Sequence, residues 1–256
     1  MRLPALFFLF FILSQACTFA ASTLSPESQK IILKADQLRE QQKHQEAIIL
    51  LEQANRNDPE QAAILYRLAE QYAASVAYII SKDGRIKLTE IAIDHAQRAI
   101  KADPKSGEAH LALAVSYGRL AENLPPRKQL TYSELIKSEA EEAARLNPKL
   151  DYAWHIQGRW HYEMATLNPV LRTFARILQG KLPPASLKTS IKCFKKAVAL
   201  APRRIQHHVE LGRAYLAAEN RKEAKKEFEL ALRLKAKNKD ELQAQKTART
   251  TLSKMK

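Results

Sequence analysis

Apolar residues recur three and four positions apart along most of this chain, a spacing that places them on one face of an α-helix. The segment 207–234 has this pattern most clearly, as two amphipathic helices joined by a short turn. Small residues such as Gly212 would let these helices approach closely, and large residues such as Phe228 would fill the space between them. A single pair of this kind cannot bury its apolar faces alone, so the pattern predicts that similar pairs stack on one another.

Four prolines divide the chain into units of this kind. Each follows an alanine-rich amphipathic segment, and because proline cannot continue a helix, each marks the end of a unit. The first unit, 26–59, has the roughly 34-residue length of a tetratricopeptide repeat. The later prolines lie 45, 44 and 54 residues apart, so the second, third and fourth units carry inserts. The four prolines are Pro59, Pro104, Pro148 and Pro202.

The units predict the fold. We expect an all-α protein, a right-handed α-solenoid of about five tetratricopeptide-type helix pairs, over residues 26–256. The inserts are expected between the two helices of their units, around residues 76–86, 123–131 and 167–187. Residues 240–253 are expected to form a polar amphipathic helix that caps the exposed end of the array.

The N-terminal segment 1–21 does not belong to this array. Arg2 precedes an apolar run over residues 3–13, and small residues follow, as in a secretory signal peptide. This run is too short to span a membrane, which takes about 20 residues in a helix. We therefore expect an exported protein, in the periplasm or the secretory pathway. An uncleaved signal that acts as an anchor and lipidation of Cys17 are the alternatives, and both would attach the protein to a membrane.

Several short motifs resemble the regulator of microtubule dynamics family, over roughly residues 64–234. They are Trp154-His155-x-x-Gly158-Arg159 with its continuation through residue 165, Leu182-Pro183-Pro184 at the end of the longest insert, and Leu211-Gly212-x-x-Tyr215. The resemblance implies a helical interaction protein. It also implies kinship with members that associate with microtubules and with one that binds and transfers phospholipid at organelle contacts. Microtubules would be partners of this chain only if it were cytosolic.

The formal net charge of +15 comes from one half of the chain. Residues 1–148 contain 18 basic and 18 acidic residues, whereas residues 149–256 contain 24 basic and 9 acidic residues. Such a field attracts acidic proteins or peptides, anionic phospholipid or nucleic acid without identifying one of them. Nucleic acid is the weakest of these partners, because no DNA-binding or base-stacking motif accompanies the basic residues. A basic surface that only keeps the protein in solution is the alternative.

No pattern in the sequence indicates a reaction. It contains no nucleophile elbow, phosphate-binding loop, zinc-binding helix motif or glycine-rich nucleotide turn. His155 and His161 are six positions apart, whereas two metal ligands on one face of a helix stand four apart. His207 and His208 are adjacent and point in different directions, so each of these histidines is expected at the surface or satisfied by a hydrogen bond. We expect no enzyme, no cofactor and no metal site.

Candidate binding residues follow from the geometry of such an array. The first helix of each unit lines the concave face of the solenoid and projects a few side chains inward. Tyrosines interleaved with arginines at these positions suit an extended acidic or amphiphilic ligand. Alternatively, the same side chains only pack against the inserts. The candidate residues are Tyr66, Arg119, Tyr152, His155, Arg159, Tyr162 and Arg213.

The longest insert predicts a short basic amphipathic helix. Asn168 and Pro169 suit its first turn. Phe174 lies on its apolar face, and Arg172 and Arg176 lie on the other face. Such a helix can lie in a membrane interface or cover an apolar groove. The alternative is an extra helix that simply packs on the solenoid.

The function that these features predict is binding rather than catalysis. We expect a tetratricopeptide-repeat scaffold or adaptor that binds an acidic or amphiphilic partner through its concave face and its basic C-terminal half. Two alternatives remain. One is a phospholipid-binding or lipid-transfer protein at a membrane surface, and the other is a microtubule-associated regulator, as in the family that the chain resembles.

Overall fold

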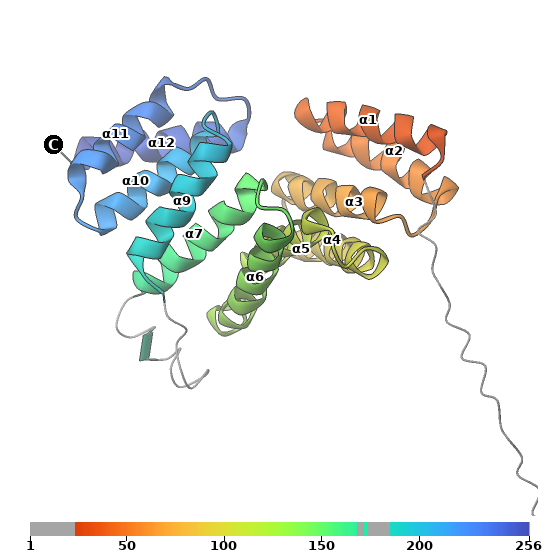
Figure 1. Cartoon of the computed structure of the whole chain (residues 1–256), viewed down its shortest axis with the longest axis horizontal. Coiled ribbons are helices and arrows are strands. Elements are labelled where there is room, and N and C mark those ends of the chain that lie inside the picture. The colour runs from red at the N-terminus through yellow and green to blue at the C-terminus, as the bar shows by residue number, and fades with distance from the viewer. Residues whose placement is uncertain (1–23, 168–171, 174–184, 256) are drawn as a thin grey trace, which may run out of the picture.

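Helices make up all the regular structure in the part of the chain that the structure describes, residues 24–167, 172–173 and 185–255. In this computed structural model they stack side by side as a curved solenoid (Figure 1), which confirms the predicted fold. The named helices are α1 (Pro26–Glu40), α2 (His44–Asn57), α3 (Ala62–Ser75), the 3-10 helix η1 (Val76–Tyr78), α4 (Lys82–Ala102), α5 (Gly107–Ala121), α6 (Pro126–Leu146), α7 (Asp151–Ala165), α9 (Leu187–Leu200), α10 (Ile205–Ala217), α11 (Arg221–Arg233) and α12 (Lys239–Lys254).

Successive helices pair as the repeat pattern predicts: α1 with α2, α3 with α4, α5 with α6, α7 with α9, and α10 with α11. Helix α12 packs against α10 and α11 and is the predicted cap. Small residues lie where paired helices approach most closely. A Cβ atom added to Gly212 would lie 2.7 Å from the ring of Phe228, so the two helices of the fifth unit could not pack this closely around a larger residue.

The prolines that end the units also receive a hydrogen bond from the next unit. In three successive units a ring N–H six residues after the proline lies against the prolyl carbonyl oxygen. Each such contact fixes the first helix of a unit to the end of the unit before it, and it satisfies a carbonyl that lies beyond a helix C-terminus. The contacts are His110 Nε2 to Pro104 at 3.4 Å, Trp154 Nε1 to Pro148 at 3.0 Å, and His208 Nε2 to Pro202 at 2.8 Å.

The inserts of the second and third units are mostly helical. They lengthen the second helix of each unit, so that α4 and α6 each have 21 residues, whereas α2 has 14. Ser81 begins α4 by accepting a hydrogen bond from the Gly84 backbone N–H, and Pro126 is the first residue of α6. Residues predicted as additions between the helices are therefore largely extra turns of a helix. Most of the third insert, 167–187, lies outside the described residues.

Polar contacts also join units of the array to one another. Arg67 donates hydrogen bonds to both carboxylate oxygens of Asp36 at 2.9–3.2 Å, which joins the first unit to the second. At the far end, the ammonium group of Lys239 lies 5.6 Å from the ring centroid of Tyr78, so the start of the cap helix lies against the insert of the second unit. No helix in the described ranges combines the length and apolar character that crossing a bilayer requires.

Candidate functional site

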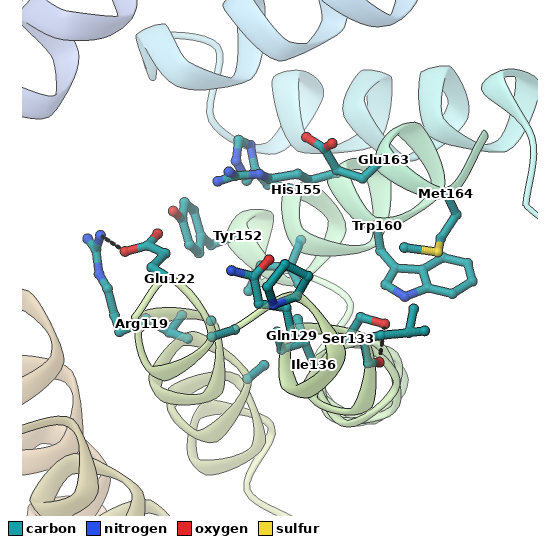
Figure 2. A pocket seen from close by; sticks show the side chains of 18 of the residues that line it. Arg119, Glu122, Gln129, Ser133, Ile136, Tyr152, His155, Trp160, Glu163 and Met164 are labelled. Carbon is teal, nitrogen blue, oxygen red and sulfur yellow. Dashed lines mark hydrogen bonds and ion pairs between the residues drawn. The ribbon is translucent and has the colours of Figure 1, made fainter. Parts of the chain in front are cut away.

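A cavity of about 620 Å³ lies between α5, α6 and α7, where the third unit meets the fourth. We call it the central cavity, and Figure 2 shows its lining. Its volume arises from small side chains on α5, since Ala114, Gly118 and Ala121 line it there. A Cβ atom added to Gly118 would meet no other heavy atom within 4 Å. The space is therefore left open by the sequence of α5.

The outer part of the same junction is well packed. Ala143 of α6 and Ala153 of α7 are fully buried in one apolar cluster. The side-chain amide of Gln157 donates a hydrogen bond of 3.0 Å to the carbonyl oxygen of Ala140, which fixes α7 on α6. The third and fourth units are thus held together on one side, while the central cavity remains on the other.

The walls of the central cavity are mainly apolar and aromatic. Branched and sulfur-containing side chains come from all three helices, and two aromatic rings on α7 complete the surface. Apolar walls with a few polar groups are the usual composition of a ligand pocket in this size range. The principal wall residues are Val115, Leu130, Ile136, Ile156, Tyr152 and Trp160.

Charged residues surround one end of the cavity. Arg119 and Glu122 form a loose ion pair of 3.5 Å there, as Figure 2 shows. Arg159 also lines the cavity, is exposed, and forms no ion pair with any residue that the structure describes. An exposed guanidinium group beside an apolar wall suits a ligand that carries a carboxylate or phosphate next to an apolar part.

At the other end, Trp160 brings a buried hydrogen-bond donor without a partner. Only 5% of the residue is exposed, and its indole Nε1 has no hydrogen-bond partner among the residues that the structure describes. The Lys137 ammonium group lies 5.2 Å from the ring centroid. A buried donor left unpaired costs about 1–3 kcal/mol. A bound group with an acceptor atom, or water held by such a group, would remove this cost.

A hydrogen-bonded chain that runs from exposed Arg204 to the buried His207 and His155 closes the next junction, between the fourth and fifth units. Arg204 contacts the Asp151 carboxylate at 2.9 Å, and the same oxygen, Oδ2, lies 2.7 Å from His207 Nε2. His207 Nδ1 lies 2.9 Å from His155 Nδ1, and Tyr152 stacks on the His155 ring at 4.8 Å. Tyr152 and His155 also line the central cavity, so this chain reaches its wall.

The chain has a definite proton arrangement when both histidines are neutral. His207 then donates its Nε2 proton to Asp151, so its Nδ1 is an acceptor and His155 must donate from Nδ1. Burial, and the nearby positive charge that His207 would carry, hold the pKa of His155 well below its usual value. Burial also lowers the pKa of His207, although Asp151 acts in the opposite direction. Burial opposes ionisation of Asp151, but its bond to His207 and the nearby Arg204 lower its pKa overall.

Cys193 and the potential metal ligands are the side chains to compare with what reactive sites require. Burial raises the pKa of the Cys193 thiol to about 11, so it stays protonated near neutral pH. Among the residues that the structure describes, no three His, Cys, Asp or Glu side chains are grouped so that they could hold a metal ion. The central cavity offers a ligand apolar walls, the guanidinium group of Arg159 and the indole N–H of Trp160.

The structure brings four of the seven predicted concave residues together at the central cavity, and these are Arg119, Tyr152, His155 and Arg159. The other three lie elsewhere. The Arg67 guanidinium lies 4.7 Å from the Tyr66 ring, and burial raises the pKa of Tyr66 to about 12. The Arg213 guanidinium lies 4.8 Å from the Tyr162 ring. These three residues are occupied by contacts within the array.

Of the residues predicted on the longest insert, the structure describes only Arg172. Arg172 donates hydrogen bonds to the carbonyl oxygens of Ala165 and Leu167, at 3.1 and 3.5 Å, near the C-terminal end of α7. Phe174 and Arg176 lie outside the described residues. The placement of this insert on a membrane or over a groove stays a prediction.

Sequence reasoning missed several residues of the site. It singled out neither Trp160 nor Gly118. It expected each of His155 and His207 at the surface or satisfied by a hydrogen bond, without identifying that they are buried and hydrogen-bond to each other across 52 positions. The small residues of α5 that recur on one face, Ala114 and Gly118, were the signal that could have indicated an open junction.

Known proteins similar to this chain carry related names. The family described as Regulator of microtubule dynamics protein 1-3 matches residues 31–256. Human Regulator of microtubule dynamics protein 2 is 25% identical over 228 residues, which are 88% of this chain and 56% of the human protein. Bovine Regulator of microtubule dynamics protein 1 is 27% identical over 214 residues, or 82% of this chain and 67% of the bovine protein. The chain thus spans between about half and two thirds of the length of these relatives.

Solved structures resemble the fold. A thermophilic tetratricopeptide-repeat protein of Thermus thermophilus matches with a TM-score of 0.61 at 19% identity, over 87% of this chain and 99% of that chain. PilF of Pseudomonas aeruginosa matches with a TM-score of 0.53 at 14% identity, over 89% of this chain and 86% of that chain. At these identities the likeness concerns the arrangement of helices and nothing further.

Proposed function

The chain belongs to the regulator of microtubule dynamics family, and from this premise we propose that it is a non-catalytic scaffold that binds a protein partner through the central cavity. Helical-repeat arrays bind partners along their inner surfaces. The observation that carries the proposal is the open space of about 620 Å³ between α5, α6 and α7, with apolar walls and Arg159 beside them. A cavity of this size is large enough to receive anchor side chains of a partner.

The chemistry of the lining favours an amphiphilic peptide segment. Aromatic or branched side chains would pack against Ile136, Ile156 and the Trp160 ring. A carboxylate on the same segment would pair with Arg159, which no described acidic residue engages. A backbone carbonyl of the segment would accept from the Trp160 indole N–H, which otherwise lacks a partner.

Filling the cavity from Gly118 is the sharpest test. In the Gly118→Leu variant the new side chain would enter the cavity that Gly118 lines, since its Cβ meets no described atom beyond its own helix within 4 Å. Leucine also favours a helix over glycine by up to about 1 kcal/mol, so the variant should keep or raise its unfolding midpoint. We expect peptides selected from a displayed random library on the natural protein to share an apolar anchor beside an acidic residue, and to lose binding to the variant.

The control variant carries the same kind of substitution where it cannot affect the cavity surface: Lys222→Leu, on an exposed position of α11. It should bind the selected peptides as the natural protein does. The proposal would be contradicted if the library yields no peptide whose binding depends on the open cavity. Phospholipid that co-purifies with the natural protein in native mass spectrometry, and is absent from Gly118→Leu, would replace a peptide ligand with a lipid and support the lipid-binding alternative.

A second candidate rests on the names of the relatives, which are regulators of microtubule dynamics. A microtubule-associated role predicts that the protein co-sediments with polymerised tubulin, and that high salt weakens this through the basic C-terminal half. Full recovery of the protein in the supernatant at low salt would exclude it.

The two candidates differ in the compartment that they require. We favour export, because residues 1–21 have the order of a signal peptide: a basic residue, an apolar run and then small residues. Mass spectrometry of the protein from its native cell gives the mature N-terminus. A chain that begins near residue 21 supports export, while an intact N-terminus in a cytosolic fraction supports the microtubule candidate.

A further inference from the structure

Helix α9 carries four lysines on one face, at positions 188, 192, 195 and 196. We call Lys188, Lys192, Lys195 and Lys196 the lysine stripe. None of the four is buried, whereas Cys193 and Phe194 on the opposite face are buried against the array. At about 100° per residue, the four lysines fall within about a quarter to a third of the helix circumference. The stripe is therefore one continuous surface about 12 Å long.

The stripe is not neutralised within the molecule. Helix α9 contains no Asp or Glu, and none of the four lysines forms an ion pair with any described residue. The residues outside the described ranges contain no Asp or Glu either. The positive charge of the lysine stripe is thus not paired with any carboxylate that the structure describes.

The neighbouring second helix, α11, has a different arrangement of charge. Glu223 lies in its first turn and Arg233 in its last, which suits the helix dipole. Its lysines alternate with acids, and Lys226 contacts Glu223 while Lys225 contacts Glu229, both at 3.8 Å. Both helices have like charges four positions apart and a lysine in the first turn, which disfavour a helix, but α9 has no acidic residue to offset them. The stripe therefore does not serve the stability of its own helix.

We infer that the lysine stripe docks an acidic polypeptide segment of a partner. Lys188 and Lys192 are separated along the axis by about 6 Å, from the helical rise per residue. In an extended chain, side chains on one face repeat at about 6.6–6.8 Å, so carboxylates on alternate residues match that spacing. Each carboxylate would meet an ammonium group that no internal acid holds. The inference concerns a surface outside the lining of the central cavity, so it does not rest on the proposed function.

The surroundings of the stripe favour a polypeptide over a membrane or nucleic acid. Helices that lie in a membrane interface insert apolar side chains beside their basic ones. In the described part of the chain, the large apolar residues that are exposed lie on other elements and none lies on α9, α10 or α11. Single-stranded nucleic acid is bound by aromatic rings beside the basic groups, and α9 offers no exposed aromatic residue.

The test compares two variants of equal charge. One replaces Lys192, Lys195 and Lys196 with Gln, and the matched control replaces Lys222, Lys225 and Lys226 of α11 with Gln. The probe is a fluorescent peptide in which Glu alternates with Ser, and binding is followed by anisotropy at low ionic strength. We expect the stripe variant to bind about tenfold more weakly and with a smaller salt dependence, and the control to change much less.

Circular dichroism and thermal unfolding separate binding from folding. The stripe variant should unfold at the same or a higher temperature than the natural protein, because like charges are removed from one helix. Equal weakening in both variants would mean a diffuse basic field and would overturn the inference. Failure of the natural protein to bind the peptide would also overturn it. The same holds if the stripe substitutions weaken binding of phosphatidylserine vesicles or single-stranded DNA more than they weaken binding of the peptide.

Discussion

The junction between the third and fourth units is hollow, and the junction between the fourth and fifth is closed. Both use the same helix, α7. On one side its residues line a cavity of about 620 Å³, opposite the small side chains of α5. On the other side His155 hydrogen-bonds to His207 of α10, and His207 bonds to Asp151. The repeat therefore determines that units stack, while the side chains of the first helices determine whether a junction fills.

This difference identifies the hollow junction as the place where the array is less stable than its fold would allow. A hollow junction forgoes dispersion contacts, and Trp160 forgoes a hydrogen bond. Positions that could be filled without strain but are left open are typical of binding sites, because natural proteins accept lower stability there. The closed junction, with its buried polar chain, is the part in which single substitutions should cost most.

The largest effect is expected for His207→Ala at the closed junction. His207 is fully buried, and its removal leaves a void, leaves His155 Nδ1 unpaired, and leaves the Asp151 carboxylate with Arg204 alone. The free energy of unfolding should fall by about 3 kcal/mol or more, measured by urea denaturation. Val115→Ala, on the wall of the hollow junction, is the control and should cost about 1 kcal/mol or less. Similar losses for the two variants would remove the contrast between the junctions.

An intermediate effect is expected for Gly158→Ala. An added Cβ would lie 2.9 Å from the ring of Phe194, in the contact between α7 and α9. Crowding of this kind costs about 1–3 kcal/mol. The same substitution at Gly118 meets open space and should raise the free energy of unfolding by up to about 1 kcal/mol, from helix propensity. The two alanine variants should thus shift the thermal unfolding midpoint in opposite directions, and shifts of the same sign would contradict the predicted spaces around these glycines.

The smallest effect concerns pH. The lowered pKa of His155 means that, as the pH falls below about 6.5, the unfolded chain takes up a proton that the folded chain does not. Stability is then lost on acidification. Burial opposes protonation of His208, but Glu227 and the Pro202 carbonyl outweigh it and raise its pKa. His208 therefore stabilises the fold below about pH 6.5, and this contribution is lost as the pH rises through its folded pKa.

The two histidines can be separated by substitution. Between pH 7 and pH 5.5, His155→Gln should reduce the loss of unfolding free energy by about 1 kcal/mol, and His208→Gln should increase it by a similar or smaller amount. Urea titrations at a series of pH values measure both slopes. Parallel slopes for the two variants would show that these side chains titrate alike.

The array itself was accessible from the sequence because its signals are local. Helix periodicity and the prolines at 59, 104, 148 and 202 each depend on neighbouring residues only, and they located the five helix pairs. The inserts were found by length, but their helical form depends on packing against the partner helix. Ser81 and Pro126, which begin α4 and α6, were the local signs that the added residues continue as helix.

The site was less accessible, because it depends on how one unit meets the next. Arg119, Tyr152, His155 and Arg159 were chosen from their inward positions, and the structure places them around one cavity. Tyr66 and Arg213 were chosen by the same rule but pack elsewhere. The Arg67 guanidinium lies over the Tyr66 ring, and the Arg213 guanidinium lies over the Tyr162 ring. A rule for one repeat cannot indicate which junction stays open, since that depends on the residues of the adjacent unit.

The contact of Lys239 with Tyr78 has a consequence for folding. In a linear repeat array each unit meets only its neighbours, so the ends can unravel independently. Here the cap helix also meets the second unit, and opening either the cap or the second unit loses a cation–π contact of about 0.5–1 kcal/mol. Hydrogen exchange in the cap helix and in the second unit should therefore be correlated, with the two opening together more often than independent opening would allow.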